Sequence, residues 1–84
     1  MYYVYVLYSR TFDKFYIGFS EDLPHRLFEH QQHKVWTTMR MRDLELAYYE
    51  VSRTKKDAIR REQQLKTGFG RAYLRRRLGD YLGG

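Results

Sequence analysis

The stretch FYIGFSEDLPHRLFEH, residues Phe15 to His30, decides the fold of this chain. It predicts a short strand over Phe15–Phe19, a tight acidic turn, and a helix that begins near Asp22. An aspartate is a good N-cap, because its side chain accepts a hydrogen bond from a free backbone N–H of the first turn. Pro24 then lies in that first turn, where a missing N–H costs no hydrogen bond.

One face of this predicted helix combines apolar and polar residues. Leu23, Arg26, Leu27 and His30 follow the spacing i, i+3, i+4 and i+7, which places them on the same side. The two leucines predict that this face packs inward. A guanidinium held against the core is unfavourable unless it binds something there. The sequence therefore predicts a functional site on this face.

Two more strands are predicted outside this stretch. Residues Tyr2–Tyr8 are aromatic and β-branched, and they should form an antiparallel hairpin with the strand at Phe15–Phe19. Residues Leu44–Val51 are predicted to form a third strand with Leu44, Leu46 and Tyr48 on one side. The intervening residues 33–42 are predicted to be irregular.

Two helices are predicted after the third strand. Thr54 followed by Asp57 is a capping-box pattern that opens the first of them, and Gly68 is predicted to close it. A last helix is expected from Arg71 to about Leu82. The order β-β-α-β-α-α predicts an α+β fold in which helices flank a three-stranded antiparallel sheet, within a single domain over residues 1–84.

Composition narrows the function further. The 84 residues contain no Cys, which excludes disulfides, thiolate metal sites and a Cys nucleophile. Residues 53–84 carry ten basic and three acidic side chains, whereas residues 1–52 carry six and seven. This one-sided excess favours a polyanionic partner. No signal peptide or membrane-spanning run is recognisable, so a cytoplasmic protein without a membrane partner is expected.

Glu62 is the second polar residue on an apolar helix face, where it lies in one arc with Ala58 and Leu65. Two interpretations are open. The first is a structural ion pair with Arg26, although such buried pairs stabilise a fold weakly. The second is a carboxylate that holds a divalent cation in a cleft.

Tyr5 and Tyr16 are predicted to lie beside each other on adjacent strands. Tyrosines in a strand are usually packing residues, which is the simpler interpretation. Near Arg26 and a cation, however, their hydroxyls would ionise below the usual pKa of about 10 and activate a water. His30 is either a half-buried structural histidine or, beside Arg26, a phosphate ligand or helper base.

These residues together resemble the GIY-YIG nuclease domain, and more narrowly its small stand-alone bacterial members. The resemblance rests on four features in the order of the family: Tyr3-Val4-Tyr5, Tyr16-Ile17-Gly18, Arg26 with His30, and Glu62 in RREQQLK. It covers nearly the whole chain. The resemblance implies an endonuclease that hydrolyses phosphodiester bonds of single-stranded or structured DNA, in repair or recombination, as a monomer or weak homodimer without a small-molecule cofactor.

The resemblance also implies residue roles. Tyr5 and Tyr16 would be the two motif tyrosines, one of them the general base, with His30 assisting. Arg26 would stabilise the scissile phosphate, and Glu62 would bind a single Mg²⁺, for which Mn²⁺ substitutes. Gly18 would keep the strand end open for the substrate backbone.

Three positions depart from the family pattern. Tyr3 replaces the first motif glycine, the chain has no Asn downstream of Glu62, and Phe19 stands where some relatives have a lysine. Lys14 or Lys34 would then supply the nearby cation.

A set of basic residues is expected to contact nucleic-acid phosphates, although a solvated helical surface is the simpler interpretation. These are Lys14, Lys34, Arg53, Lys55, Lys56, Arg60, Arg61, Lys66 and Arg71. The main alternative to a nuclease is a non-catalytic nucleic-acid-binding module with the same fold. A protein-interaction adaptor with an incidental basic face is the third.

Overall fold

The structure is a computed structural model, and it describes residues 1–32 and 43–83. Its elements are β1 (Tyr2–Ser9), β2 (Lys14–Ser20), α1 (Leu23–Gln31), β3 (Leu44–Ser52), α2 (Lys55–Leu65) and α3 (Gly68–Arg77). The predicted order β-β-α-β-α-α and the α+β class are confirmed. The predicted irregular segment and Lys34 lie outside the described residues.

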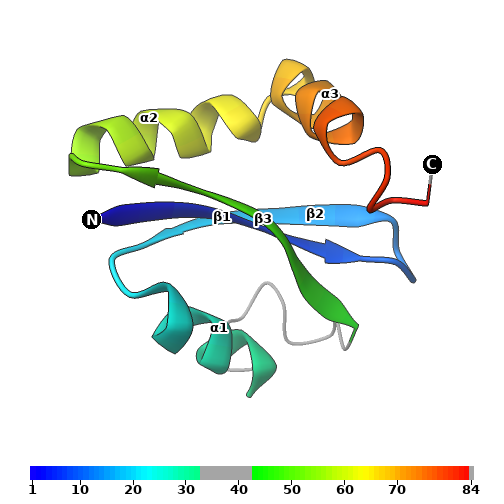
Figure 1. Ribbon diagram of the computed structural model, residues 1–84, viewed down its shortest axis with the longest axis horizontal. Helices are drawn as coiled ribbons and strands as arrows, with labels where there is room; N and C mark the ends of the chain where they lie inside the picture. The colour runs from blue at the N-terminus through cyan, green and yellow to red at the C-terminus, as the bar shows by residue number, and fades with distance from the viewer. Residues whose placement is uncertain (33–42, 84) are drawn as a thin grey trace.

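A three-stranded antiparallel sheet forms the centre of the molecule, with strand order β2-β1-β3. Helices α2 and α3 cover one face of this sheet and α1 lies against the other (Figure 1). In the hairpin, Tyr5 of β1 faces Gly18 of β2, and Leu7 faces Tyr16. Strand β2 is therefore an edge strand that carries both Tyr16 and Gly18.

The side chains of β1 alternate between two apolar clusters, as the sequence predicts. Val4 and Val6 pack with Leu65 and Leu74 under α2 and α3. Tyr5 and Leu7 pack with Leu23 and other residues on the side of α1. Burial of both faces of the central strand stabilises the fold through the hydrophobic effect.

The prediction for the faces of β3 was wrong at one point. The pairing of β3 with β1 shifts between Val6 and Leu7, so that Val6 faces Tyr48 whereas Leu7 faces Leu46. A bulge of this kind inserts one extra residue and changes the faces of the residues beyond it. As a result Leu44 packs on the α1 side and Tyr48 packs on the α2 and α3 side.

The helix boundaries near the C-terminus also differ from the prediction. Helix α2 begins after its N-cap Thr54, whose side chain accepts from the N–H of Asp57, as predicted. Gly68 does not close α2, because it is the first residue of α3, and Thr67 is the N-cap. No helix within residues 1–32 and 43–83 is long and apolar enough to cross a membrane.

Candidate active site

The phenol of Tyr5 is the centre of a polar cluster on the α1 side of the sheet. Its side chain is fully buried, at 0% relative exposure. The Nε of Arg26 donates to the Tyr5 oxygen at 3.2 Å, and the same oxygen lies 3.0 Å from Nε2 of His30. Asp22 caps α1, as predicted, and the helix presents Arg26 and His30 one turn apart. The predicted inward orientation of these two residues is confirmed.

The electrostatics of this cluster fix its protonation. Burial, and then the nearby Arg26 charge, lowers the pKa of His30, so its imidazole is neutral at pH 7. The Tyr5 oxygen accepts a hydrogen bond from Nε of Arg26 and shares a second hydrogen bond with Nε2 of His30, in which the tautomer of His30 determines the donor.

Arg26 alone does not make Tyr5 ionise more easily than usual. Burial raises the pKa of Tyr5, although Arg26 lowers it in part. The cost of placing a phenolate out of water exceeds the attraction of one guanidinium. Tyr5 therefore acts as a hydrogen-bonded phenol at neutral pH.

Tyr16 also contacts His30. The ring centroids of Tyr16 and His30 are 5.2 Å apart, and those of Tyr5 and His30 are 5.6 Å apart. Both tyrosine rings thus pack against one imidazole. Tyr16 is only partly buried, so it is the more accessible of the two to a substrate.

Gly18 is needed for a reason other than the predicted one. A Cβ at this position would lie 2.3 Å from the hydroxyl oxygen of Tyr5. The space above this glycine is filled by the phenol and is not left open for a substrate backbone. The absence of a side chain lets Tyr5 lean across the edge strand, and this gathers Arg26 and His30 over β2.

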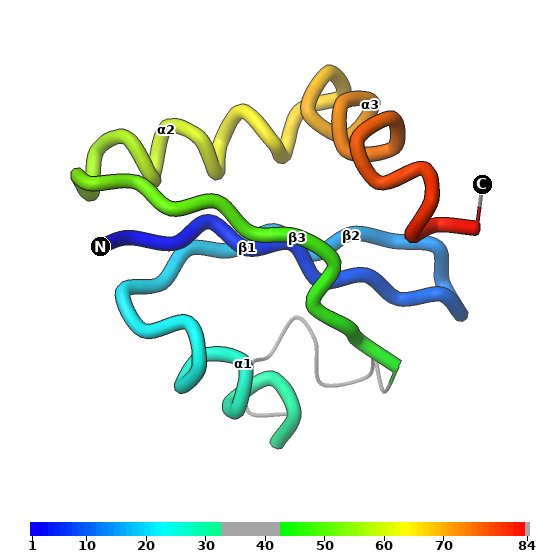
Figure 2. Tube along the Cα trace, in the orientation of Figure 1, coloured from blue at the N-terminus to red at the C-terminus, as the bar shows by residue number. Residues whose placement is uncertain are grey.

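Glu62 lies on α2, which covers the face of the sheet opposite to α1 (Figure 2). Its side chain is 20% exposed, and its carboxylate lies 3.5 Å from the ammonium of Lys66. Helix α2 packs on both β1 and β2, and the Glu62 charge contributes to the raised pKa of Tyr5. The negative charge of Glu62 therefore acts on the Tyr5 hydroxyl, although the two residues lie on opposite faces of the sheet.

The interpretation of Glu62 as a structural partner of Arg26 does not fit these contacts. Arg26 pairs with Glu29 at 3.4 Å, while Glu62 pairs with Lys66. Glu29, which orients Arg26, was not among the predicted site residues. Its i, i+3 position relative to Arg26 was the available signal.

The predicted nucleic-acid contacts divide into engaged and available side chains. Arg61 binds Glu50 with a shortest distance of 2.9 Å, and Arg60 lies 3.6 Å from Asp57. Within the described part of the chain, five exposed basic residues of the predicted set form no ion pair: Lys14, Arg53, Lys55, Lys56 and Arg71. An exposed cation without an acidic neighbour contributes most to the attraction of phosphates.

Metal binding at Glu62 agrees with its donor chemistry. Among the residues that the structure describes, no group of three or more His, Asp or Glu side chains gathers around one point. Mg²⁺ is commonly held by one or two carboxylates together with waters and substrate phosphates. A single, partly exposed carboxylate is therefore a suitable protein ligand for such an ion.

Comparison with known proteins gives one match. Residues 1–77 match the family described as the GIY-YIG catalytic domain. Neither a curated protein nor a solved structure matches the chain. The matched range extends from β1 to the end of α3, so it contains Tyr5, Tyr16, Arg26, His30 and Glu62.

Proposed function

Because this chain belongs to the GIY-YIG family of catalytic domains, which are nucleases, we propose that it is a metal-dependent endonuclease that hydrolyses DNA. Single-stranded or structured DNA, as met in repair or recombination, is the proposed substrate. The observation that best supports catalysis is the hydrogen-bonded chain from Arg26 through Tyr5 to His30. Burying one charged and two neutral polar groups on the core side of a helix costs free energy. Stabilisation of a reacting phosphate would explain why the fold places them there.

Arg26 is proposed to bind the scissile phosphate. Its Nε contacts Tyr5 and its Nη1 contacts Glu29, so the Nη2 end takes part in neither contact. The side chain is 34% exposed, which allows a substrate to reach it. A guanidinium held by two neighbours is preorganised for the charge that develops on the phosphate oxygens.

Tyr16 is proposed to orient the attacking water, since it is the more accessible tyrosine. Tyr5 is proposed as a positioning residue that fixes Arg26 and His30. Neutral His30 shares a hydrogen bond with the Tyr5 hydroxyl and contacts the rings of both tyrosines, which places it to assist proton transfer.

Glu62 is proposed to hold Mg²⁺ or Mn²⁺. When bound, such an ion neutralises charge on the leaving oxygen and lowers the pKa of a coordinated water. Gly18 supports this arrangement indirectly, because it allows the Tyr5 phenol to lie over the edge strand.

A non-catalytic nucleic-acid-binding module is the second candidate. It is favoured by the ion pair between Glu62 and Lys66, which engages the carboxylate proposed for the metal. This candidate predicts salt-dependent DNA binding without hydrolysis.

The test is a cleavage assay on labelled single-stranded, duplex and branched DNA with Mg²⁺, Mn²⁺ or a chelator. The wild type should cut only with a metal ion, and Arg26→Ala and Glu62→Gln should each lose about 100-fold or more in rate. Glu21→Gln, at an exposed position, is the matched control and should cut as the wild type does. Binding without any cleavage would reject the enzyme and support the module.

A further inference from the structure

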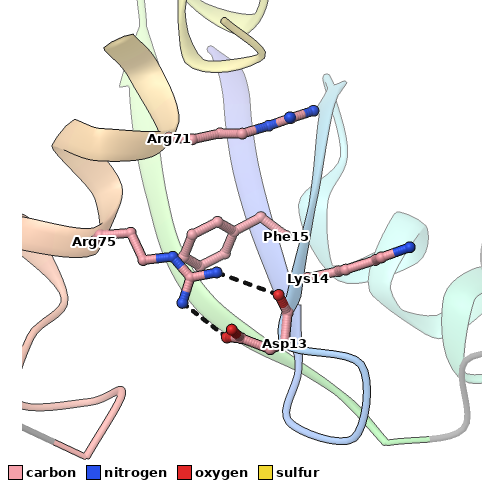
Figure 3. A pocket seen from close by; sticks show the side chains of 5 residues that line it. All are labelled: Asp13, Lys14, Phe15, Arg71 and Arg75. Carbon is pink, nitrogen blue, oxygen red and sulfur yellow. Dashed lines mark hydrogen bonds and ion pairs between the residues drawn. The ribbon is translucent and has the colours of Figure 1, made fainter. Parts of the chain in front are cut away.

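A cavity of about 380 Å³ lies between the beginning of β2 and helix α3. It is lined by Asp13, Lys14, Phe15, Arg71 and Arg75, as Figure 3 shows. The two guanidiniums outnumber the one carboxylate, so the cavity has a net positive charge even without Lys14. The volume falls within the range of roughly 300–1,000 Å³ that ligand sites occupy. We call it the β2–α3 cavity.

Arg75 is held in place at one side of the β2–α3 cavity. Its Nη1 donates to Oδ1 of Asp13 at 2.7 Å and its Nη2 donates to the Asp13 carbonyl at 3.2 Å. The guanidinium carbon also lies 5.0 Å from the centroid of the Phe15 ring. A planar guanidinium fixed in this way keeps further N–H donors for a ligand at little entropic cost.

Arg71 and Lys14 are not neutralised by this arrangement. Both are exposed, and neither side chain forms an ion pair or hydrogen bond within residues 1–32 and 43–83. Arg71 lies one helical turn before Arg75, so two like charges share one face of α3, which is unfavourable without an anion. Phe15 points toward α3 whereas Lys14 points the opposite way, toward the α1 side of the sheet (Figure 3).

The position of the β2–α3 cavity connects it to the candidate active site. Phe15 precedes Gly18 by three residues on the same strand, which corresponds to about 10 Å at the usual rise. A nucleic-acid strand bound at Arg26 would reach the cavity within a few nucleotides if it crosses the edge of β2. Lys14 lies on that path, on the same side of the strand as Tyr16.

We infer that the β2–α3 cavity binds a phosphate group of the nucleic-acid strand, a few nucleotides from the phosphate bound by Arg26. This inference rests on the proposed function for the position of the second phosphate. Arg71 and Arg75 bind the phosphate oxygens inside the cavity, and Lys14 attracts the backbone between the two phosphates. The site positions the strand without reading its sequence, because it contacts phosphate and not base edges.

The test is a binding scan with oligonucleotides in which one phosphate at a time is replaced by an uncharged methylphosphonate. Affinity is measured by fluorescence anisotropy without divalent metal, so that no strand is cut. The wild type should lose affinity about tenfold at one position beyond the scissile one, since a charge-assisted contact is removed there. In Arg71→Gln this position-specific loss should vanish.

Arg76→Gln is the matched control, because it removes an equal charge from an exposed position on the same helix outside the cavity. Arg76→Gln should at most lower the affinity for all oligonucleotides by a similar factor. The additional loss at the one methylphosphonate position should remain. Oligonucleotides with a 5′-phosphate or a 5′-hydroxyl distinguish a strand end from an internal phosphate. The inference is overturned if no methylphosphonate position shows an affinity loss that depends on Arg71, or if Arg76→Gln abolishes the loss at the same position.

A cleavage assay on the same oligonucleotides separates this inference from the proposed function. Hydrolysis by the wild type without any Arg71-dependent position would reject the cavity as a phosphate site and leave the nuclease intact. An Arg71-dependent position without hydrolysis would support the cavity and reject the enzyme.

Discussion

Tyr5 and Gly18 show how one missing side chain determines a site. The phenol reaches over the neighbouring strand to Arg26 and His30 only because no Cβ occupies that space. The hydrogen bonds then keep a buried hydroxyl satisfied, which an apolar neighbour would not do. The missing side chain of Gly18 thus allows the Tyr5 ring to pack and its hydroxyl to form hydrogen bonds.

Gly18→Ala should destabilise the fold by about 1–3 kcal/mol, because an added methyl group would displace the Tyr5 ring from a filled core position. Urea denaturation measures this change in the free energy of unfolding. Gly68→Ala is the control, since nothing lies within 4 Å of a Cβ there and alanine favours the helix. Equal stabilities for the two variants would contradict this account.

His30 should make stability depend on pH below neutrality. Its folded pKa lies below the unfolded value of about 6.5, so the unfolded state takes up the proton more readily. Stability is therefore lost as pH falls through about 6.5, until the folded value is passed. Between pH 7.5 and 5.5, the wild type should lose more free energy of unfolding than His30→Gln. Parallel pH profiles would show that His30 is not the group responsible.

At this scale the sequence predicted which residues meet but not their ionisation. The i, i+3, i+4, i+7 spacing placed Arg26 and His30 correctly. The pKa of Tyr5 depends on how completely the phenol is removed from water, and periodicity carries no measure of that.

The joint between α2 and α3 is the element that the sequence described least well. Gly68 was predicted to end one helix and the last helix was predicted to begin at Arg71, yet α3 begins at Gly68 and Gly70 is buried within it. A Cβ on Gly70 would lie 2.3 Å from the carbonyl oxygen of Gln64. Gly70 permits the close contact between α2 and α3. A glycine that ends a helix looks the same in a sequence, so the sequence does not distinguish the two roles.

Gly70→Ala should cost roughly 3 kcal/mol, at the upper end for overpacked sites, because the clash is with backbone atoms that cannot rotate away. Thermal denaturation followed by circular dichroism is the measurement. Gly79→Ala, where a Cβ would meet only ordinary contacts, should change stability little. A Gly70→Ala variant as stable as the wild type would show that the joint opens without cost.

The three strands were predicted well because their residues alternate and are strongly β-forming. The exception, the faces of β3, arose from the register shift opposite Val6 and Leu7. A bulge is set by pairing with another strand, so residues 44–51 alone do not contain it.

At the scale of the whole molecule, the proposed function requires residues on two opposite faces of the sheet to serve one reaction. Helix α1, which carries Arg26, and helix α2, which carries Glu62, lie on opposite faces of the sheet (Figure 1). In the proposed reaction, the phosphate would lie at the edge strand β2, where both faces of the sheet meet. Sequence order gives the succession of elements, whereas the face that each helix covers depends on packing with distant residues.

The most direct measurement is a double-mutant cycle on single-turnover cleavage with Mg²⁺, using Arg26→Lys and Glu62→Asp so that rates stay measurable. If both residues act on one phosphate across the edge of β2, the double variant should be slowed much less than the product of the two single effects. A double variant slowed by the full product of the two single effects would contradict a shared site, and so would full activity in either single variant.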